Sequence, residues 1–562
     1  MDASVRHKAE EIMRALEGEQ REISMADPVA KMLLVALAHQ SDELGRKIDS
    51  TVSRVAANLC REAILGSEFR PLPALSVLKI GNGPEYTPYR IDEKVEFTYP
   101  KTKCCYRALF PALVVPGDVT GFYCDGSLHY PMQEPVEADE PLHDAELWVA
   151  YSPANDVETL ENVVIAVNHP LGDGSPVTAR VGDVTYPLIP VSESVAPWLE
   201  GSYMLTEYWR RHLVFMRLWL YRFGAPDVES PLLTEEMPGW FLDMYEPETL
   251  SPFSGRRHLW IRITSPGLSV PDDSHIEFNC LPVANYDIHT VKLSYTEPMR
   301  PLDNPKTGAQ FFELIEDPEQ TEDYFVRDFD IDQYDDRRIA EDIRNLYDHY
   351  VDDYYAFVDN NSLNDGAVLR SLRQSMLQVV DSIPSSQTSK TYAGCYLIRS
   401  PKNSGRPVVV KYLTTQGARG NLLKEMTKLT CSYAAPGAVV ALIGAEGGRD
   451  KISGQTGLHE QAAFTLASND RLFTDMDIRR YCRLEFLRAL GETAMRYCTI
   501  SLTHGSRPVG NHIERCVTVT FAFTSETHYR TALELNFAQY LKTNIEMRKS
   551  FTENINVNIR ML

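Results

Sequence analysis

The run LSVLKI at residues 75–80, followed at once by GNG at 81–83, sets the pattern for the first half of the chain. From about residue 71 to 200, short apolar runs alternate with turn residues, as in VVIAVN at 163–168. Short runs rich in β-branched residues and bounded by Gly, Asn and Pro are typical of strands. We therefore expect a β-rich body, which strand-like runs such as LWIRI at 259–263 continue.

One segment interrupts this strand pattern. The run YMLTEYWRRHLVFMRLWLYRF at residues 203–223 predicts a helix inserted in the body, with too many charges to span a membrane. Aromatic residues at helical spacing are more often part of a core than of a binding face. If the helix is exposed in the monomer, it instead predicts a partner-binding surface. The aromatic residues concerned are Tyr208, Trp209, Phe215, Trp219 and Tyr221.

A long helix is predicted ahead of the body. It starts at Asp27-Pro28, a favourable first turn, and runs to Gly66. Such a helix would be about 55–60 Å long and would outgrow a small domain, so it would either cross a large domain or pack against a partner. One narrow apolar seam follows it at spacings of three, four and seven residues, which favours packing against a partner helix. The seam consists of Leu37, Leu44, Ile48, Val52, Val55 and Leu59.

The later part of the chain changes composition twice. Residues 311–359 are acidic and tyrosine-rich, and after Pro384 a last α+β pattern begins. That pattern predicts strands near 393–399 and 407–413 and helices over 475–497 and 525–544.

The predicted fold class is therefore multidomain α+β, with long N-terminal helices, a central β-rich part and a small C-terminal α+β module. The predicted domains are an N-terminal helical segment for a partner bundle (1–70), a β-rich body (71–310), an acidic helical connector (311–390) and a C-terminal α+β domain (391–562).

Composition excludes several classes of protein. The 562 residues are 43% hydrophobic and 24% charged, which is ordinary globular usage, and the formal net charge is −22. So acidic a chain is not expected to bind nucleic acid or anionic lipid non-specifically. No apolar run is long enough to cross a bilayer, the N-terminus has no signal-peptide pattern, and the 10 Cys residues contain no C-x-x-C spacing. We therefore expect a soluble, cytoplasmic protein with reduced thiols and no direct membrane insertion.

A search for chemistry leaves no strong candidate. The acidic run at 328–332 lacks the Gly and the twelfth-position Glu of an EF-hand, and is interpreted as a solvated face. The H-x-E triplets at 275–277 and 512–514 lack a following P-C-x-x-C. The Gly-rich run at 444–449 lacks the Lys of a phosphate-binding loop and is interpreted as a loop or turn. We expect no catalytic, cofactor-binding or metal-binding residue and no enzymatic activity.

Three stretches, taken in order, resemble one family. They are DP with MLLVALAHQSDELGRKID within 27–49, FNCLPVAN at 278–285, and VVVKYLTTQGARG at 408–420. Together they resemble the TssF family (also called VasA or ImpG), a baseplate subunit of the bacterial type VI secretion system. The most specific element is the Asn-Cys-x-Pro-x-x-Asn run of Asn279, Cys280, Pro282 and Asn285. Residues 1–21 differ from the family's usual start, and residues 471–562 also look like the tail of phage baseplate wedge proteins, which suggests a divergent branch.

The resemblance implies a non-enzymatic role without a cofactor. It implies a wedge in which two copies of this chain join one TssG-like subunit and bind a TssK-like subunit, with a TssE-like sheath adaptor and a VgrG-like spike as further neighbours. Such wedges surround the spike and anchor the contractile sheath. They lie in the cytoplasm and dock at the inner membrane through other subunits.

Other functions stay open. The first alternative is a wedge protein of a related contractile phage-tail-like device. Another is a β-rich adaptor or carbohydrate-binding protein that uses aromatic contacts such as Tyr123, Tyr130 and Trp148. A third is a hydrolase, which would need two carboxylates in a pocket with shifted pKa values.

Overall fold

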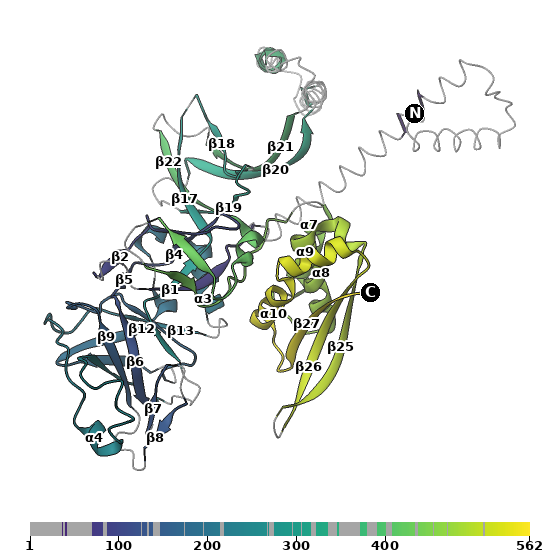
Figure 1. Cartoon of the computed structure of the whole chain (residues 1–562). Coiled ribbons are helices and arrows are strands. Elements are labelled where there is room, and N and C mark those ends of the chain that lie inside the picture. The colour runs from purple at the N-terminus through teal and green to yellow at the C-terminus, as the bar shows by residue number, and fades with distance from the viewer. Residues whose placement is uncertain are drawn as a thin grey trace. The chain divides into compact units, whose positions relative to one another are not determined.

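The computed structural model describes residues 70–334, 371–378 and 390–562 apart from short internal gaps, together with 36–37, 40–41 and 346–347. The chain divides into two compact units (Figure 1). Unit 1 comprises Met1–Asp287 and Thr415–Leu562, and unit 2 comprises Ile288–Thr414. Figure 1 colours the chain from purple at the N-terminus to yellow at the C-terminus.

A closed barrel in unit 1 joins strands from three distant parts of the sequence. In barrel order these are β1 (Leu75–Ile80), β16 (Cys280–Ala284), β4 (Cys104–Ala108), β3 (Glu96–Tyr99), β23 (Lys428–Cys431) and β24 (Val439–Ala441). The barrel closes because β24 pairs back onto β1, with Leu78 opposite Ala441. Phe97 and Tyr106 lie opposite each other on β3 and β4 and are fully buried. Alternate side chains thus fill the barrel interior. A separate pair, β2 (Tyr89–Ile91) and β5 (Ala112–Val114), lies outside the barrel sheet.

The larger part of the body is a ten-stranded antiparallel sheet. Its order is β15-β10-β13-β12-β11-β14-β9-β6-β7-β8. The strands are β6 (Gly117–Cys124), β7 (Ser127–His129), β8 (Val136–Glu137), β9 (Glu146–Pro153), β10 (Val164–Val167), β11 (Val177–Val181), β12 (Val184–Pro190), β13 (Trp219–Phe223), β14 (Leu259–Thr264) and β15 (Ile276–Phe278). The strand-like runs at 163–168 and 259–263 are thereby confirmed as β10 and β14.

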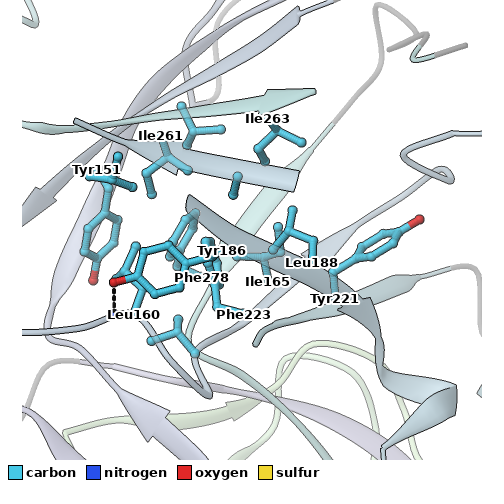
Figure 2. Packing of buried hydrophobic residues seen from close by; sticks show 14 of the residues in the cluster. Tyr151, Leu160, Ile165, Tyr186, Leu188, Tyr221, Phe223, Ile261, Ile263 and Phe278 are labelled. Carbon is cyan, nitrogen blue, oxygen red and sulfur yellow. Dashed lines mark hydrogen bonds between the residues drawn. The ribbon is translucent and has the colours of Figure 1, made fainter. Parts of the chain in front are cut away.

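The sheet curls around an apolar core (Figure 2). The ring of Tyr151 on β9 stacks on that of Phe278 on β15, with 4.7 Å between centroids, so strands far apart in the sheet face each other. Ile261 and Phe223 are both fully buried in this core. The Tyr186 hydroxyl satisfies the Leu160 N–H at 3.3 Å, the hydrogen bond drawn in Figure 2. Each large side chain buried in this way stabilises the fold by about 1.5–3 kcal/mol.

A second, aromatic cluster lies beneath the short helix α4 (Trp240–Met244). The ring of Phe241 packs against Tyr123 at 5.9 Å and Trp260 at 5.3 Å. Tyr123 is fully buried and Tyr130 is 8% exposed. The prediction that these two tyrosines contact a carbohydrate is therefore wrong, because both rings are used to pack α4 onto the sheet.

The helix predicted over 203–223 is shorter than expected. The structure has α3 (Tyr203–Leu213), and residues 219–223 form β13. The physical reason is a change of period: Tyr221 and Phe223 alternate into the sheet core, and β13 pairs with both β10 and β12. Two short 3-10 turns, η2 (Val191–Glu193) and η3 (Pro197–Leu199), precede α3.

Unit 2 contains two three-stranded sheets. One has the order β17 (Tyr286–Leu293), β22 (Val408–Thr415), β19 (Gln310–Ile315). The other has the order β18 (Met299–Pro301), β21 (Lys390–Arg399), β20 (Tyr324–Tyr334). The Asp303 carboxylate accepts hydrogen bonds from the Phe311 N–H at 2.6 Å and the Cys395 N–H at 2.8 Å. One side chain thus ties the two sheets together.

The structure differs from the prediction of an acidic helical connector over residues 311–390. Its first part forms β19 and β20, and the described helical residues are 346–347 and 371–378. The acidic run at 328–332 lies within β20, paired with β21, so it is extended backbone rather than a cation-binding loop. Pairing with β21 outweighs the low strand propensity of Asp.

The C-terminal module packs helices on one face of a three-stranded sheet (Figure 1). The sheet order is β25 (Cys498–Val509), β26 (His512–Phe523), β27 (Asn554–Met561). The helices are α7 (Gln455–Ser468), α8 (Asp475–Met495), α9 (Glu526–Glu534) and α10 (Phe537–Arg548). A capping box between Thr474 and Asp477 starts α8, in agreement with the predicted helix over 475–497.

Two predictions for the C-terminal half need correction. The helix expected over 525–544 is divided into α9 and α10 by Asn536, whose φ of 50° is left-handed. The domain expected to begin at residue 391 is smaller, because β21 and β22 lie in the sheets of unit 2 and β23 and β24 close the barrel. Long-range pairing of this kind leaves no local signal in sequence. The predicted fold class, multidomain α+β with a β-rich body and a small C-terminal α+β module, is confirmed.

The structure describes only a few residues of the predicted N-terminal helix. Ala36, Leu37, Gln40 and Ser41 are helical, and Leu37 is 52% exposed. The remaining seam residues, Leu44, Ile48, Val52, Val55 and Leu59, lie outside the described residues. In the part of the chain that the structure describes, no helix is long and apolar enough to cross a membrane.

Candidate functional site

The Asn-Cys-x-Pro-x-x-Asn run lies where the chain passes from one sheet to another. Phe278 ends β15 in the ten-stranded sheet, and Cys280 begins β16 in the barrel. Asn279 is the single residue between them and has a left-handed φ of 57°. Asn tolerates this conformation better than most residues. The first Asn of the motif is therefore the hinge at which the backbone changes sheets.

The Asn279 side chain replaces a missing backbone pairing. Its Oδ1 accepts from the Val115 N–H at 3.0 Å, and its Nδ2 donates to the Val115 carbonyl at 2.7 Å. The Val115 carbonyl also accepts a hydrogen bond from the Tyr151 hydroxyl. All three residues are at most 5% exposed, so these bonds satisfy polar groups that water does not reach.

The middle of the motif is structural as well. Cys280 is 2% exposed, and burial raises the pKa of its thiol, so the thiolate needed for chemistry is disfavoured. Pro282 lies opposite Val77 of β1, whereas β4 pairs with β16 only at Val283 and Ala284. A proline fits at that place because it has no N–H to donate to a second neighbouring strand.

The last Asn of the motif contacts the other stretch that resembles the TssF family. Asn285 Oδ1 accepts from the Thr415 hydroxyl at 2.6 Å and from the Gln416 N–H at 3.1 Å. Gly417 follows with a left-handed φ of 52°, and the Ala418 N–H donates to Asp450 Oδ1 at 3.0 Å. Residues 278–285 and 408–420, separate in sequence, are thus joined in a buried turn.

The Gly-rich run at 444–449 forms a tightly held turn beside them. Asn421 accepts from the Gly448 N–H at 2.8 Å and donates to its carbonyl at 2.7 Å. The N–H groups of Ala445, Glu446 and Arg449 donate to backbone carbonyls. Because these amides are already used, the run cannot serve as a phosphate cradle. Its interpretation as a turn is confirmed.

Gly447 brings this turn against helix α3. Its φ is 82°, and a Cβ there would collide with the Tyr208 hydroxyl and with the His212 ring. The His212 ring is fully buried, and neither ring nitrogen has a hydrogen-bond partner among the described residues. Burial, reinforced by Arg548, lowers the pKa of His212 to about 4. The histidine is therefore neutral near pH 7.

The same turn docks onto the C-terminal module. The Glu446 carboxylate accepts from Thr543 Oγ1 at 2.9 Å and from Gln539 Nε2 at 3.3 Å, both on α10. Arg449 lies 3.8 Å from Glu485 on α8. We call this set of contacts, together with the Glu485 partners described next, the junction cluster.

Glu485 is the centre of the junction cluster and is fully buried. It accepts from Arg488 Nη1 at 2.6 Å and from the Tyr540 hydroxyl. Burial alone would raise the pKa of Glu485, but Arg488, Arg449 and the Tyr540 hydrogen bond together lower it below its ordinary value. The carboxylate is thus charged and compensated, which is the condition for a stable buried ion.

The aromatic residues predicted on one helix are divided by the structure. Trp209, on α3, and Tyr221, on β13, are buried, so the core interpretation is confirmed for these two. Phe215 lies outside the described residues, and Trp219 is 38% exposed. Trp219 lies at an apolar groove of about 650 Å³ at the ends of β12 and β13, rimmed also by Pro187, Pro190 and Leu171.

The H-x-E triplet at 275–277 forms a partly exposed ion-pair group. His275 Nε2 lies 3.2 Å from Glu277, which also binds Lys79. In the part of the chain described by the structure, no group of three or more His, Cys, Asp or Glu side chains has the arrangement of a metal site. The side chain of His512, in the second triplet, lies outside the described part.

Sequence reasoning missed the junction cluster. The available signal was the position of Glu485 and Arg488 on α8, among Tyr481, Cys482 and Leu484, which are all buried. Charges three residues apart within an apolar stripe indicate a compensated buried pair. No local pattern links them to Arg449, because that contact spans two structural modules.

No family model matches the chain, and no curated protein matches it. Among solved structures, the chain is similar to one chain of the type VI secretion system TssK-TssF-TssG baseplate subcomplex determined by cryo-electron microscopy. The similarity covers 95% of this chain and 96% of the other, with 12% sequence identity and a TM-score of 0.38.

Proposed function

We propose that this chain is a structural subunit of a type VI secretion baseplate wedge. One observation carries the proposal. The two stretches of the described region that resemble the TssF family are joined directly through the Asn285 amide to Thr415 and Gln416. The residues of the resemblance are therefore those that build the barrel turns, as expected where a family preserves a scaffold.

We infer a non-enzymatic role from the way the polar residues are used. The Asn279 amide, the Asn285 amide oxygen, the Gly-rich turn and the Glu485 carboxylate make their hydrogen bonds inside the fold. The carboxylate of Glu485, which is fully buried, is compensated by arginines rather than left in an open pocket. A scaffold needs this arrangement for rigidity, whereas an acid–base catalyst needs an accessible group.

The proposed partners are a TssG-like and a TssK-like subunit and a second copy of this chain, with a TssE-like sheath adaptor and a VgrG-like spike as further neighbours. The proposed location is the cytoplasmic side of the inner membrane, reached through other subunits. The predicted seam from Leu37 to Leu59 would supply the partner helix bundle.

Co-expression with TssG-like and TssK-like subunits from the same organism tests the proposal. We expect the full chain to co-purify with both subunits. Failure of the unmodified chain to co-purify with either would overturn the wedge assignment. Neighbouring genes for another contractile device, without TssG-like and TssK-like subunits, would favour the related injection device instead.

A double variant tests the seam separately. Leu44→Asp with Ile48→Asp should abolish co-purification with the TssG-like subunit, because two charges would face the partner helix. The matched control is Arg46→Asp with Ser50→Asp, two residues at the same spacing outside the seam. Circular dichroism should show an unchanged body in both. Co-purification of the Leu44/Ile48 variant at the wild-type yield would remove the seam from the proposal.

A further inference from the structure

The C-terminal module, residues 455–562, has an apolar core of its own. Its helices and strands pack chiefly on one another, and the buried residues of that core extend from Ile452 to Ile555. The chain passes from the body into the module once, ahead of α7. Parts of a chain that keep separate cores move relative to one another unless a large apolar interface joins them. The contacts across the joint therefore decide whether the module is fixed.

The body side of this joint is the Gly-rich turn at 444–449, which is held firmly to the segment that leads into β1. The N–H groups of Leu75 and Glu446 donate to each other's carbonyls at 2.8 and 2.9 Å. Leu72 and Arg449 exchange the same pair of hydrogen bonds. The turn is thus part of the body, and the module rests on it.

The side chains that bridge from the turn to the module make polar contacts. The Glu446 carboxylate accepts from Thr543 and Gln539, and Arg449 lies 3.8 Å from Glu485. Such contacts replace hydrogen bonds to water, so each contributes only a small net free energy to docking.

Glu485 does not need the body in order to stay compensated. Its closer partners are Arg488, at 2.6 Å, and the Tyr540 hydroxyl, and both belong to the module. If the module left the turn, the buried carboxylate would lose only the longer contact with Arg449. Separation at this joint therefore leaves the charges within the module paired.

Docking also leaves polar atoms of α3 without partners. The Tyr208 hydroxyl and both ring nitrogens of His212 are buried and have no hydrogen-bond partner among the described residues. Both side chains lie within reach of the Arg548 charge, and Tyr208 also of the Glu485 charge, so they face the module. A buried polar atom without a partner keeps the full cost of losing its water. Separation of the module would let water reach these atoms and remove that cost.

We propose that the C-terminal module docks on the body reversibly, so that the full chain populates a minor open state in which both parts stay folded and the junction cluster is separated. Glu446 and Arg449 favour the closed state, whereas the unpartnered groups of Tyr208 and His212 favour the open one. The inference concerns the chain by itself and does not depend on the assembly that it joins.

Acylation of histidine rings by diethyl pyrocarbonate near pH 7, measured residue by residue by mass spectrometry on the full chain, tests the inference. His212 and His258 are both 0% exposed, so neither should react in the closed structure. His258 lies among the aromatic rings beneath α4, away from the joint, and reacts only when the body opens. We expect His212 to react at least about tenfold faster than His258. Equal rates would overturn the inference.

A variant in the module shows whether this reactivity comes from undocking. Thr543→Val removes a donor to Glu446 with little change of shape, and should raise the rate at His212 about fivefold without changing that at His258. The matched control is Thr531→Val on α9, whose hydroxyl donates to the Thr527 carbonyl within the helix, and it should change neither rate. An unchanged rate at His212 in Thr543→Val would mean that α3 opens locally, and would overturn the inference.

A variant on α3 should act in the opposite direction. Tyr208→Phe removes the unpartnered hydroxyl and keeps the ring, so it should favour the closed state and slow the reaction of His212 by at least about threefold. A faster reaction in this variant would show that the hydroxyl stabilises docking, which contradicts the inference.

Discussion

The core of the ten-stranded sheet and the junction cluster are both buried, but the first consists of apolar side chains and the second contains charged ones. The sheet core consists of aliphatic and aromatic side chains such as Ile261, Phe223 and Phe278. The junction cluster buries Glu485 among arginines, and it lies beside the neutral ring of His212. Apolar contacts tolerate a change of pH, whereas a buried charge is stable only while its partners keep their own charge.

The two regions therefore have different structural roles: the apolar core holds the sheet together, and the junction cluster fixes how two parts of the chain are oriented. The apolar core holds the sheet together without specifying direction, because the hydrophobic effect is non-directional. The hydrogen bonds of Glu446 and Glu485 require particular partners at particular positions, so they fix how the Gly-rich turn meets α8 and α10. The following predictions test whether the two regions fail in these different ways.

The largest effect is expected for Glu485→Gln. It leaves the buried guanidinium of Arg488 without its counter-charge, which should destabilise the fold by about 3–5 kcal/mol. Denaturant unfolding monitored by fluorescence measures the change. Glu534→Gln, at an exposed position of α9, serves as control and should change stability by less than about 0.5 kcal/mol. Equal effects of the two variants would contradict a structural role for the buried charge.

His212 should make the junction sensitive to acid. Its pKa is lowered from 6.5 to about 4 in the folded state, so the unfolded chain takes up the proton first. The neutral His212 therefore causes no loss of stability above pH 6.5. As the pH drops from 6.5 towards 4, the free energy of unfolding falls, and below pH 4 the total loss stays on the order of 3 kcal/mol. The unfolding midpoint of wild type and of His212→Leu, measured from pH 7 to 4.5, should show the steeper fall in wild type. Parallel curves would rule out the histidine as the source.

The hinge at Asn279 should show an intermediate effect. Asn279→Ala loses the two hydrogen bonds to Val115 and replaces Asn, which tolerates the left-handed conformation, with Ala, which disfavours it, at a cost of about 2–3 kcal/mol. Asn279→Gly loses the same hydrogen bonds but tolerates the conformation, so it should be less destabilising by roughly 1 kcal/mol. Thermal unfolding compares the pair. An alanine variant as stable as the glycine variant would show that the left-handed backbone imposes no cost.

The smallest effect is expected in the sheet core. Ile261→Val removes one methylene from a fully buried residue and should cost about 0.5–1.5 kcal/mol. Because no titratable group is changed, the loss should be the same at pH 7 and at pH 5. If the loss of stability in Ile261→Val depended on pH, it would contradict the proposed difference between the sheet core and the junction cluster.

Local pattern was sufficient for much of the β-rich body. The apolar runs at 75–80, 163–168 and 259–263 became β1, β10 and β14 because their length and flanking turns favour strands wherever they pair. The helix predicted over 475–497 is confirmed as α8, and the structure adds the capping box that begins it.

The remaining features depend on contacts between distant residues. Residues 219–223 were predicted as part of a helix. They form a strand because β10 and β12, from other parts of the sequence, pair with them, and this pairing leaves no local signal. The role of Asn285 could not be read from the sequence, since its partners Thr415 and Gln416 lie in another part of the chain. The predicted partner seam remains a prediction beyond Leu37.

The closed barrel imposes an order on biosynthesis. Its first strand, β1, must wait for β24, where Leu78 finally meets Ala441. At ribosomal speeds the delay is roughly 20–70 s. During that interval one edge of this apolar strand stays unpaired, even after β16 has paired with its other edge. Early release from the ribosome or a slow translation pause before residue 441 should therefore favour aggregation.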